Sequence, residues 1–271
     1  MSKTPNPNRL IADSPRRRQQ WRRIIAPAIT IAVLLGLWQI WVAAGGISER
    51  ILPSPSQIAQ ATAATWPELM TASAITAAEG FAGFIVASAV GLLIGVGLYC
   101  WQTLHDALYP LIAAAQMVPL ITIAPLFIIW FGFEPVGKVA IVAVFGLFPI
   151  AIQTYRGLAA VPSFYQDVAL TCGASQAWTL WHVKLRVAAG QIFSGLRISA
   201  AYVFATASTA EYLGAQNGLG IWLQSAFNSF QTPLIFSATL VIVVLTAVLL
   251  GLIAAVEHCT IDSNEESSFL R

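Results

Sequence analysis

The chain has 271 residues, of which 57% are hydrophobic and only 10% are charged. A soluble domain carries roughly 25% charged residues, so this chain lacks the polar side chains that a soluble surface needs, and its composition indicates an integral membrane protein. The net charge is only +2. The basic N-terminal segment runs straight into an apolar one, which favours a role in membrane orientation over nucleic-acid binding.

Apolar segments long enough to cross a membrane recur along the chain. Residues 1–23 are polar and rich in Pro and Arg, which predicts a flexible cytoplasmic tail. Residues 24–257 are expected to form the transmembrane domain, and residues 258–271 a short polar cytoplasmic tail. We expect an all-α protein with about six transmembrane helices, at residues 24–44, 72–99, 104–131, 138–153, 188–210 and 233–256.

Residues 47–70, between the first two spans, are semi-polar and are expected on the outer surface, with a short helix capped by Ser54 or Ser56. The second span contains Gly91 and Gly95, a G-x-x-x-G pair that permits close helix approach. It also contains Glu79. A carboxylate within the membrane is costly, so Glu79 is expected either to face protein or water, or to lie near the interface.

Three prolines interrupt the third span, and prolines remove backbone hydrogen bonds and kink helices: Pro110, Pro119 and Pro125. Such breaks persist in a membrane only where protein or water satisfies the freed backbone groups, which is compatible with a substrate path. The candidate path residues are Gln116, Pro119 and, on the fourth span, Gln153. The alternative is that Gln116 only bonds a neighbouring helix.

The fifth span is rich in small residues and is closed by Glu211. Residues 212–232, which follow it, are predicted to form a partly re-entrant outer loop that contains GAQNGLG and a short aromatic helix.

The longest polar break in the second half of the chain runs from residue 167 to 186 and reads DVALTCGASQAWTLWHVKLR. A short helix that carries Ala169 is predicted to end at Gly173, and Ser175 can cap a second helix. Hydrophobic side chains at helical spacing predict an apolar face on that second helix: Trp178, Trp181 and Leu185. The pattern indicates a helix–turn–helix elbow that a partner grips. The alternative is an interfacial loop with Trp anchors.

Charge predicts which side of the membrane the elbow faces. With six spans and the N-terminus inside, only two of the 14 Lys and Arg residues lie outside, Arg50 and Lys138. The reverse orientation would violate the positive-inside rule. Both termini and the elbow are therefore expected in the cytoplasm.

No catalytic or metal-binding set of residues emerges from the sequence. Residues 132–139, GFEPVGKV, match a phosphate-binding P-loop except at Val139, which lacks the hydroxyl needed for Mg²⁺. No H-E-x-x-H or G-x-S-x-G motif is present. An intramembrane enzyme is therefore the weaker alternative, since Ser194-Gly195 resembles a protease motif only superficially. The chain is expected to bind no metal or cofactor and to lack its own ATPase.

The elbow resembles the cytoplasmic signature of the permease subunits of bacterial ABC importers: Glu-Ala-Ala, three residues, Gly, nine residues, Ile-x-Leu-Pro. Here the frame is Asp167-Val168-Ala169, Gly173 and Val183-Lys184-Leu185-Arg186, with the spacing kept. Residues 52–58, 118–138 and 210–220 are similar to outer and intramembrane motifs of the branch that imports sulfonates, taurine, nitrate or bicarbonate, and thiamine-precursor pyrimidines. The similarity covers about residues 30–257. Asp, Val and Arg replace the family's first Glu, first Ala and final Pro, which leaves the local coupling geometry open.

The resemblance implies a type I ABC importer permease (MetI-like) fold in the bacterial inner membrane, and a transport subunit rather than an enzyme. It implies two ATPase subunits that bind ATP and Mg²⁺, a second copy of the permease and an external solute-binding protein, with lipid around the spans and no nucleic acid. The implied ATPase-coupling residues are Asp167, Ala169, Gly173, Ala174, Ser175, Trp178 and Leu185. Asp167 is expected either to pair with a basic group of the ATPase or to cap the first helix of the elbow.

An ion-gradient-driven secondary transporter or a channel is the alternative function. Such proteins more often carry ionisable groups in the middle of the membrane, and only Glu79 is a candidate here. The Ala- and Ser-rich spans suit a small anionic or neutral solute. Specificity in the resembled family rests largely on the external binding protein, so the sequence does not choose between a sulfonate and a pyrimidine.

Overall fold

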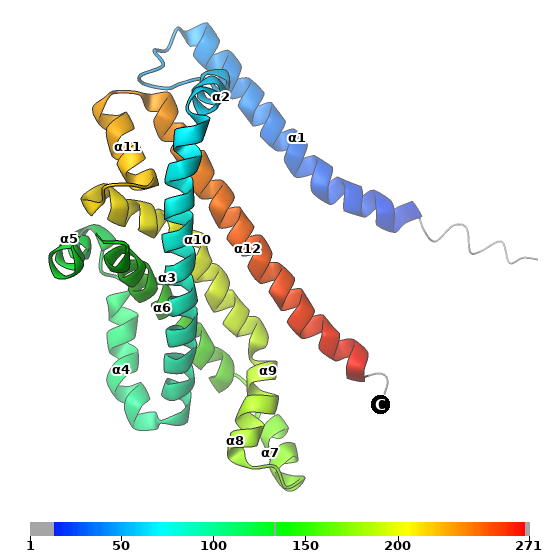
Figure 1. Ribbon diagram of the computed structural model, residues 1–271. Helices are drawn as coiled ribbons and strands as arrows, with labels where there is room; N and C mark the ends of the chain where they lie inside the picture. The colour runs from blue at the N-terminus through cyan, green and yellow to red at the C-terminus, as the bar shows by residue number, and fades with distance from the viewer. Residues whose placement is uncertain (1–13, 133, 269–271) are drawn as a thin grey trace, which may run out of the picture.

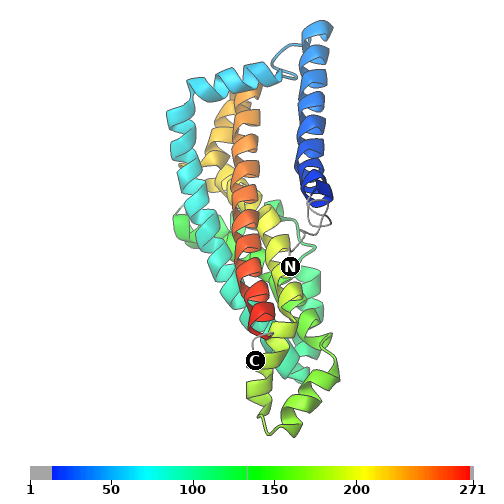
Figure 2. The ribbon, with the colours of Figure 1, turned by 90° about the vertical axis from the view of Figure 1, so that its right-hand side faces the viewer.

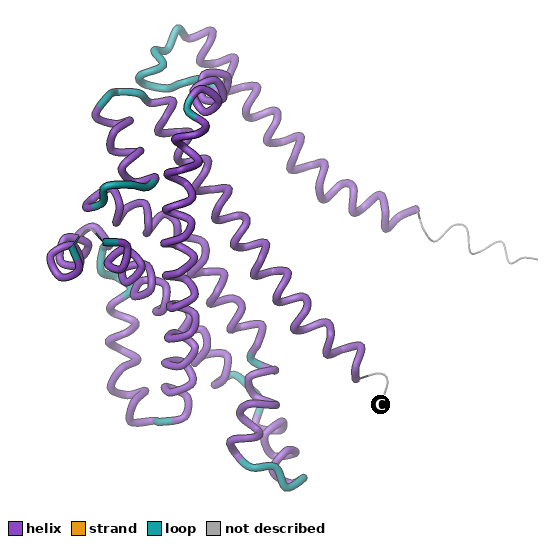
Figure 3. The backbone as a smooth tube through the Cα atoms, in the orientation of Figure 1, coloured by secondary structure: helices purple, strands orange, loops and turns teal. Residues whose placement is uncertain are grey.

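The computed structural model describes residues 14–132 and 134–268, and within these ranges the regular structure is helical. Four helices of this part of the chain are long and apolar enough to cross a membrane, and two bent helix pairs raise the number to six. The bent pairs are residues 102–131 and 176–214. These segments coincide with the six predicted spans, and short loops join them (Figure 3).

The helices are, in chain order, α1 (Ser14–Gly45), α2 (Pro55–Ala64), α3 (Trp66–Cys100), α4 (Gln102–Ala115), α5 (Leu120–Phe131), α6 (Pro135–Ala159), α7 (Ser163–Thr171), α8 (Gln176–Thr179), the π-helical turn η2 (Leu180–Lys184), α9 (Leu185–Val187), α10 (Ala189–Gly214), α11 (Leu219–Asn228) and α12 (Thr232–Ser268). Residues 14–23, expected to belong to a flexible tail, are helical, and α12 extends past the predicted sixth span into the C-terminal tail. Residues 1–13 and 269–271 lie outside the described residues.

The most extensive helix pairing joins α3 to α6. Three glycines of α3, four to eight residues apart, make this close pairing possible. A Cβ added at Gly83 would lie 2.5 Å from Val142 Cβ. Added Cβ atoms at Gly91 and Gly95 would lie 2.9 Å from Ile150 Cβ and 2.5 Å from Thr154 Cβ. The two backbones can approach closely only where these positions lack side chains. The predicted role of Gly91 and Gly95 is confirmed.

A buried hydrophobic cluster lies where α3, α6, α10 and α12 meet: Phe84, Val142, Ala200, Val203, Phe204, Ala207, Leu249 and Ile253. The apolar side chains on the outer sides of α1 and α12 are largely exposed. Only 6% of the α1 span and 11% of the α12 span is buried. This distribution suits helices whose outer faces contact lipid.

Helix α1 stands apart from the other helices over most of its length, and α2 lies across the end of the bundle between α1 and α3 (Figures 1 and 2). Helix α2 begins with a capping box in which the Ser54 side chain accepts from Gln57 N–H and the Gln57 side chain accepts from Ser54 N–H. This identifies Ser54 as the cap and decides between the two predicted residues. Trp38 of α1 packs on Phe236 of α12, with ring centroids 5.7 Å apart.

The predicted break in the third span is a bend of 104° between α4 and α5. Gln116 ends α4, and Pro119 is the N-cap residue of α5. Helix α5 lies across the bundle, and α6 begins part-way down α3 (Figure 1). Lys138, in the first turn of α6, pairs with Glu79 of α3. At a rise of 1.5 Å per residue, Glu79 lies about 20 Å along the α3 axis from Trp66, the first residue of that helix.

The residues that join α5 to α6 are exposed, among them Glu134 and Val136, whereas Lys138 in the first turn of α6 is buried against Glu79. Lys138 thus lies near the start of the fourth span, as predicted, and the side of the membrane on which it lies stays a prediction. Broken helices within a membrane are tolerated where they are buried in protein or line a water-filled cavity.

Candidate functional site

The predicted elbow is a helix–turn–helix at the end of the bundle opposite α2 (Figure 1). Helix α7 ends at Thr171, and Gly173 has φ +87°, a left-handed conformation that favours glycine. The Ser175 side chain then caps α8 by accepting from Trp178 N–H at 3.2 Å. The turn at Gly173 and the cap at Ser175 are confirmed.

The second elbow helix is not α-helical throughout, which interrupts the spacing on which its predicted apolar face rested. Leu185 N–H bonds Leu180 O, which makes one π turn of Leu180–Lys184. A π turn shifts the side chains that follow it. The buried residues are Thr179 and Lys184, five apart, whereas Trp178 and Trp181 are 48% and 60% exposed.

Lys184 joins the elbow to the bundle. Its ammonium donates hydrogen bonds to the Tyr99 hydroxyl, at the end of α3, and to Gln166 Oε1 of α7. It also lies 4.9 Å from the centre of the Tyr99 ring, within the range of a cation–π contact. One buried side chain thus connects α7, the π turn and α3, and sequence reasoning did not predict it.

An open groove of about 830 Å³ runs between α7 and α8. It is lined by Phe164, Tyr165, Val168, Ala169, Cys172, Gly173, Ala174, Ser175, Trp178 and Val183. Of the predicted coupling residues, Ala169, Gly173, Ala174, Ser175 and Trp178 share this groove, whereas Asp167 and Leu185 do not line it. The rim is aromatic and exposed, with Phe164 69% and Tyr165 44% accessible.

Asp167 does not cap the first elbow helix. Helix α7 begins at Ser163, with Pro162 as its N-cap residue, so Asp167 lies in its interior and is exposed. The other predicted role, pairing with a basic group of the ATPase, stays a prediction. Leu185 is half-buried and begins α9, and Arg186 is exposed.

The candidate path residues are not brought together. Gln116 and Pro119 are exposed at the break between α4 and α5. Gln153 lies near the end of α6, where its Oε1 accepts a hydrogen bond from Gln191 Nε2 of α10 at 2.8 Å. Gln153 therefore contacts α10, and a role of these three residues in transport stays a prediction.

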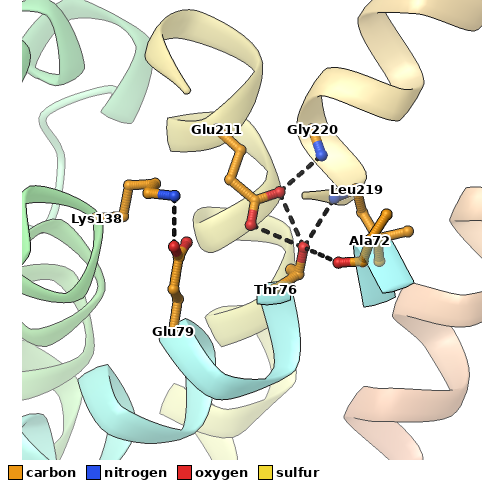
Figure 4. A network of polar contacts seen from close by, with 7 residues as sticks. All are labelled: Ala72, Thr76, Glu79, Lys138, Glu211, Leu219 and Gly220. Atoms are coloured by element: carbon orange, nitrogen blue, oxygen red, sulfur yellow. Dashed lines mark hydrogen bonds and ion pairs between the residues drawn. The ribbon is translucent and has the colours of Figure 1, made fainter. Parts of the chain in front are cut away.

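Sequence reasoning missed a second polar site, which lies in the interior of the bundle (Figure 4). Glu79 is 4% exposed and Lys138 7% exposed, and they form an ion pair between α3 and α6. Glu211 of α10 is fully buried beside them. The prediction that Glu79 faces protein is confirmed, but two further ionisable groups, Lys138 and Glu211, lie beside it.

Glu211 binds the N-terminus of α11. Its carboxylate accepts from the Thr76 hydroxyl at 2.7 Å and from Gly220 N–H at 2.7 Å. The Thr76 oxygen in turn accepts from Leu219 N–H at 2.9 Å. The isolated acidic and basic residues within apolar segments were the available signal, but Lys138 and Glu211 were placed at the ends of spans.

Comparison with known proteins identifies a matching family and several similar permease proteins. The family described as "Binding-protein-dependent transport system inner membrane component" matches residues 87–258. The chain is 29% identical over 214 residues to the formylaminopyrimidine transport permease protein ThiX of Halalkalibacterium halodurans, covering 79% of this chain and 85% of the relative. It is 34% identical over 244 residues to the riboflavin transport system permease protein RibX of Chloroflexus aurantiacus, covering 88% and 90%. Permease proteins named for aliphatic sulfonates, taurine and nitrate also match.

The fold is similar to that of a chain in the structure "Inward facing conformations of the MetNI methionine ABC transporter", with a TM-score of 0.63. The match covers 72% of this chain and 97% of the other at 16% sequence identity. The fold is therefore that of a type I ABC importer permease, as the resemblance implied.

Proposed function

Because the chain belongs to the family of binding-protein-dependent transport system inner membrane components, we propose that it works as follows. It is a permease subunit of an ABC importer, and it moves a small solute across the bacterial inner membrane. An external binding protein delivers the solute, and two copies of the chain assemble with two separate ATPase subunits. The α7–α8 elbow transmits the movement of the ATPase to the spans.

The observation that carries the coupling proposal is the elbow groove. Its aromatic rim is exposed at one end of the bundle, while Lys184 fixes the elbow to α3 from the inside. A short rigid element that is exposed on one side and tied to a long helix on the other can act as a lever between rocking parts. An interfacial Trp anchor would need neither the left-handed turn nor the buried lysine.

Lys138, which would be the phosphate-binding lysine of the P-loop-like run, supports a separate ATPase. Its ammonium is buried against Glu79 and is directed into the helix bundle. The Lys138 ammonium is therefore paired with a carboxylate and is not placed to bind a nucleotide phosphate.

The proposed substrate is a small anionic or neutral organic solute or oxyanion. The relatives are named for a pyrimidine, riboflavin, sulfonates, taurine and nitrate. The riboflavin relative adds a flavin to the substrates that the resemblance implied. Ligand binding by the cognate binding protein, measured by calorimetry across these classes, identifies which one is delivered.

Two substitutions in the groove test the coupling role. Ala169→Glu places a charge in the groove, and Gly173→Pro replaces a φ of +87° by about −65°. Both are expected to leave membrane insertion intact and to lower ATPase co-purification and ATP-dependent uptake. Gly190→Ala is the control, because nothing lies within 4 Å of an added Cβ there.

Full association and full uptake in both groove variants would reject the coupling role. Uptake into vesicles that proceeds without ATP would instead favour the alternative of an ion-gradient-driven transporter or a channel.

A further inference from the structure

Helix α11 starts inside the bundle, next to Thr76 of α3, and runs toward the α2 end (Figure 1). The first amides of any helix lack partners within the helix. The N-cap residue of α11 is Gly218, which has no side chain to cap it. The caps come instead from two other helices, since Glu211 of α10 accepts from Gly220 N–H and Thr76 of α3 accepts from Leu219 N–H.

The turn before α11 is shaped around the Glu211 carboxylate. Gly218 has φ +112°, and a Cβ there would lie 2.4 Å from Glu211 Cδ. A Cβ on Gly220 would lie 2.2 Å from Ser208 O and 2.4 Å from Tyr212 N. The Gly-Leu-Gly run therefore allows the backbone to wrap a buried carboxylate, which is more than a re-entrant turn alone requires.

Polar contacts of this kind suit a reversible attachment. A buried hydrogen bond is costly to break in a dry site but costs little when water replaces the lost partner. A purely apolar attachment would lose its contacts in either case. The N-terminus of α11 is thus held firmly while the site is dry and released readily once water enters.

The Glu79–Lys138 ion pair lies beside Glu211 (Figure 4). Glu79 repels the Glu211 carboxylate and Lys138 attracts it, so the pair does not replace the α11 amides as a partner. The Glu211 carboxylate therefore depends on Thr76 and Gly220 for its hydrogen bonds.

We propose that Thr76 and Glu211, with the amides of Leu219 and Gly220, form a latch that holds the N-terminus of α11 against α3 and α10. The latch opens when the permease turns outward to receive solute. This inference rests on the proposed function for the direction of opening. Both side chains are positioning residues, because they act through α11 and need not touch the solute.

Hydrogen–deuterium exchange of the assembled permease–ATPase complex in lipid nanodiscs tests the latch. Thr76→Val and Glu211→Gln are each expected to speed exchange in the peptide covering residues 215–228 by roughly tenfold, because each removes or weakens a buried charge-assisted bond. Thr76→Ser keeps the hydroxyl and should retain slow exchange. Thr71→Val is the matched control, because the Thr71 hydroxyl bonds only Pro67 O of its own helix among the bonds the structure shows.

A functional readout separates a latch from a purely structural contact. Latch variants should hydrolyse more ATP in the absence of the binding protein and import less solute per ATP. The double variant should show less than the product of the two single effects, since both residues act on one contact.

Three results would overturn the inference. Exchange could stay unchanged in both latch variants, it could rise equally in α3 and α10, or it could rise in α11 with ATP hydrolysis and uptake still normally coupled. Absence of ATP-dependent uptake by the unmodified complex would contradict the proposed function instead. The exchange experiment would still measure whether Thr76 and Glu211 hold α11.

Discussion

Glu79 and Lys138 place two opposite charges inside an apolar bundle, where neither would be stable alone. One oxygen of the Glu79 carboxylate has no hydrogen-bond partner among the described residues. An ion pair of this kind adds little net stability compared with apolar residues of the same size, but removing one partner is strongly destabilising.

The charge pair gives a prediction at the residue scale. Lys138→Met is expected to lower the free energy of unfolding by about 3–5 kcal/mol, because it leaves the Glu79 carboxylate buried without a cation. The double variant Glu79→Met with Lys138→Met is expected to recover most of that loss. Thermal unfolding of the purified complex in nanodiscs measures both, and equal destabilisation of the single and double variants would contradict the pairing.

The pairing of Glu79 with Lys138 could not be predicted from the sequence. A hydropathy pattern gives the length of an apolar segment but not the depth at which it begins. Lys138 follows a Gly- and Pro-containing junction, so it was placed at the outer end of the fourth span. Only the 104° bend between α4 and α5 brings the start of α6 beside the middle of α3. That bend depends on packing against other helices, which a sequence pattern does not contain.

At the scale of elements, the elbow was predicted correctly where local chemistry decides the structure. Ser175 caps a helix through its own neighbours, and Gly173 makes a left-handed turn, so both were visible in the sequence. The π turn was not visible, because the hydrophobic spacing of this segment also fits an uninterrupted α-helix.

Lys184 is expected to couple the movement of the elbow to α3. Lys184→Met removes the bonds to Tyr99 and Gln166 while leaving the groove in place. The ATPase should therefore still co-purify, whereas solute uptake per ATP hydrolysed should fall several-fold. Tyr99→Phe should give a smaller effect in the same direction.

Tyr202 of α10 is exposed and lies outside the groove, so it provides the matched control for that experiment. Tyr202→Phe should leave both association and uptake unchanged. Loss of ATPase association in Lys184→Met would show that the lysine maintains the groove rather than the connection to α3.

The pairing of α3 with α6 yields a stability prediction. Gly95→Ala would place a Cβ 2.5 Å from Thr154 Cβ and 2.7 Å from Ala151 O, so the helices must separate. Overpacking of this kind costs about 1–3 kcal/mol. Gly251→Ala on α12, where nothing lies within 4 Å, is expected to be neutral. Equal melting temperatures for the two variants would contradict the close approach.

For the whole molecule, the predicted orientation can be tested with native residues. Cys100, Cys172 and Cys259 are all exposed, and they lie at the end of α3, in the elbow and late in α12. With the elbow in the cytoplasm, a membrane-impermeant maleimide should label them in inverted vesicles that contain the permease without its ATPase, but not in intact cells.

Ile51, which is exposed in the loop before α2, provides the opposite control. In a cysteine-free chain, Ile51→Cys should be labelled in intact cells. Labelling of the native cysteines from outside the cell would reverse the predicted topology.

The single π turn between α8 and α9 also constrains how this segment can change in length. Removing one residue from Leu180–Lys184 would restore α-helical hydrogen bonding. It would also rotate the preceding part of the elbow by about 100° around the helix axis. Thr179 would leave the interior, and the exposed tryptophans would change direction. A relative that is one residue shorter in this segment would therefore present its elbow in a different direction, even if it retained every motif residue on either side.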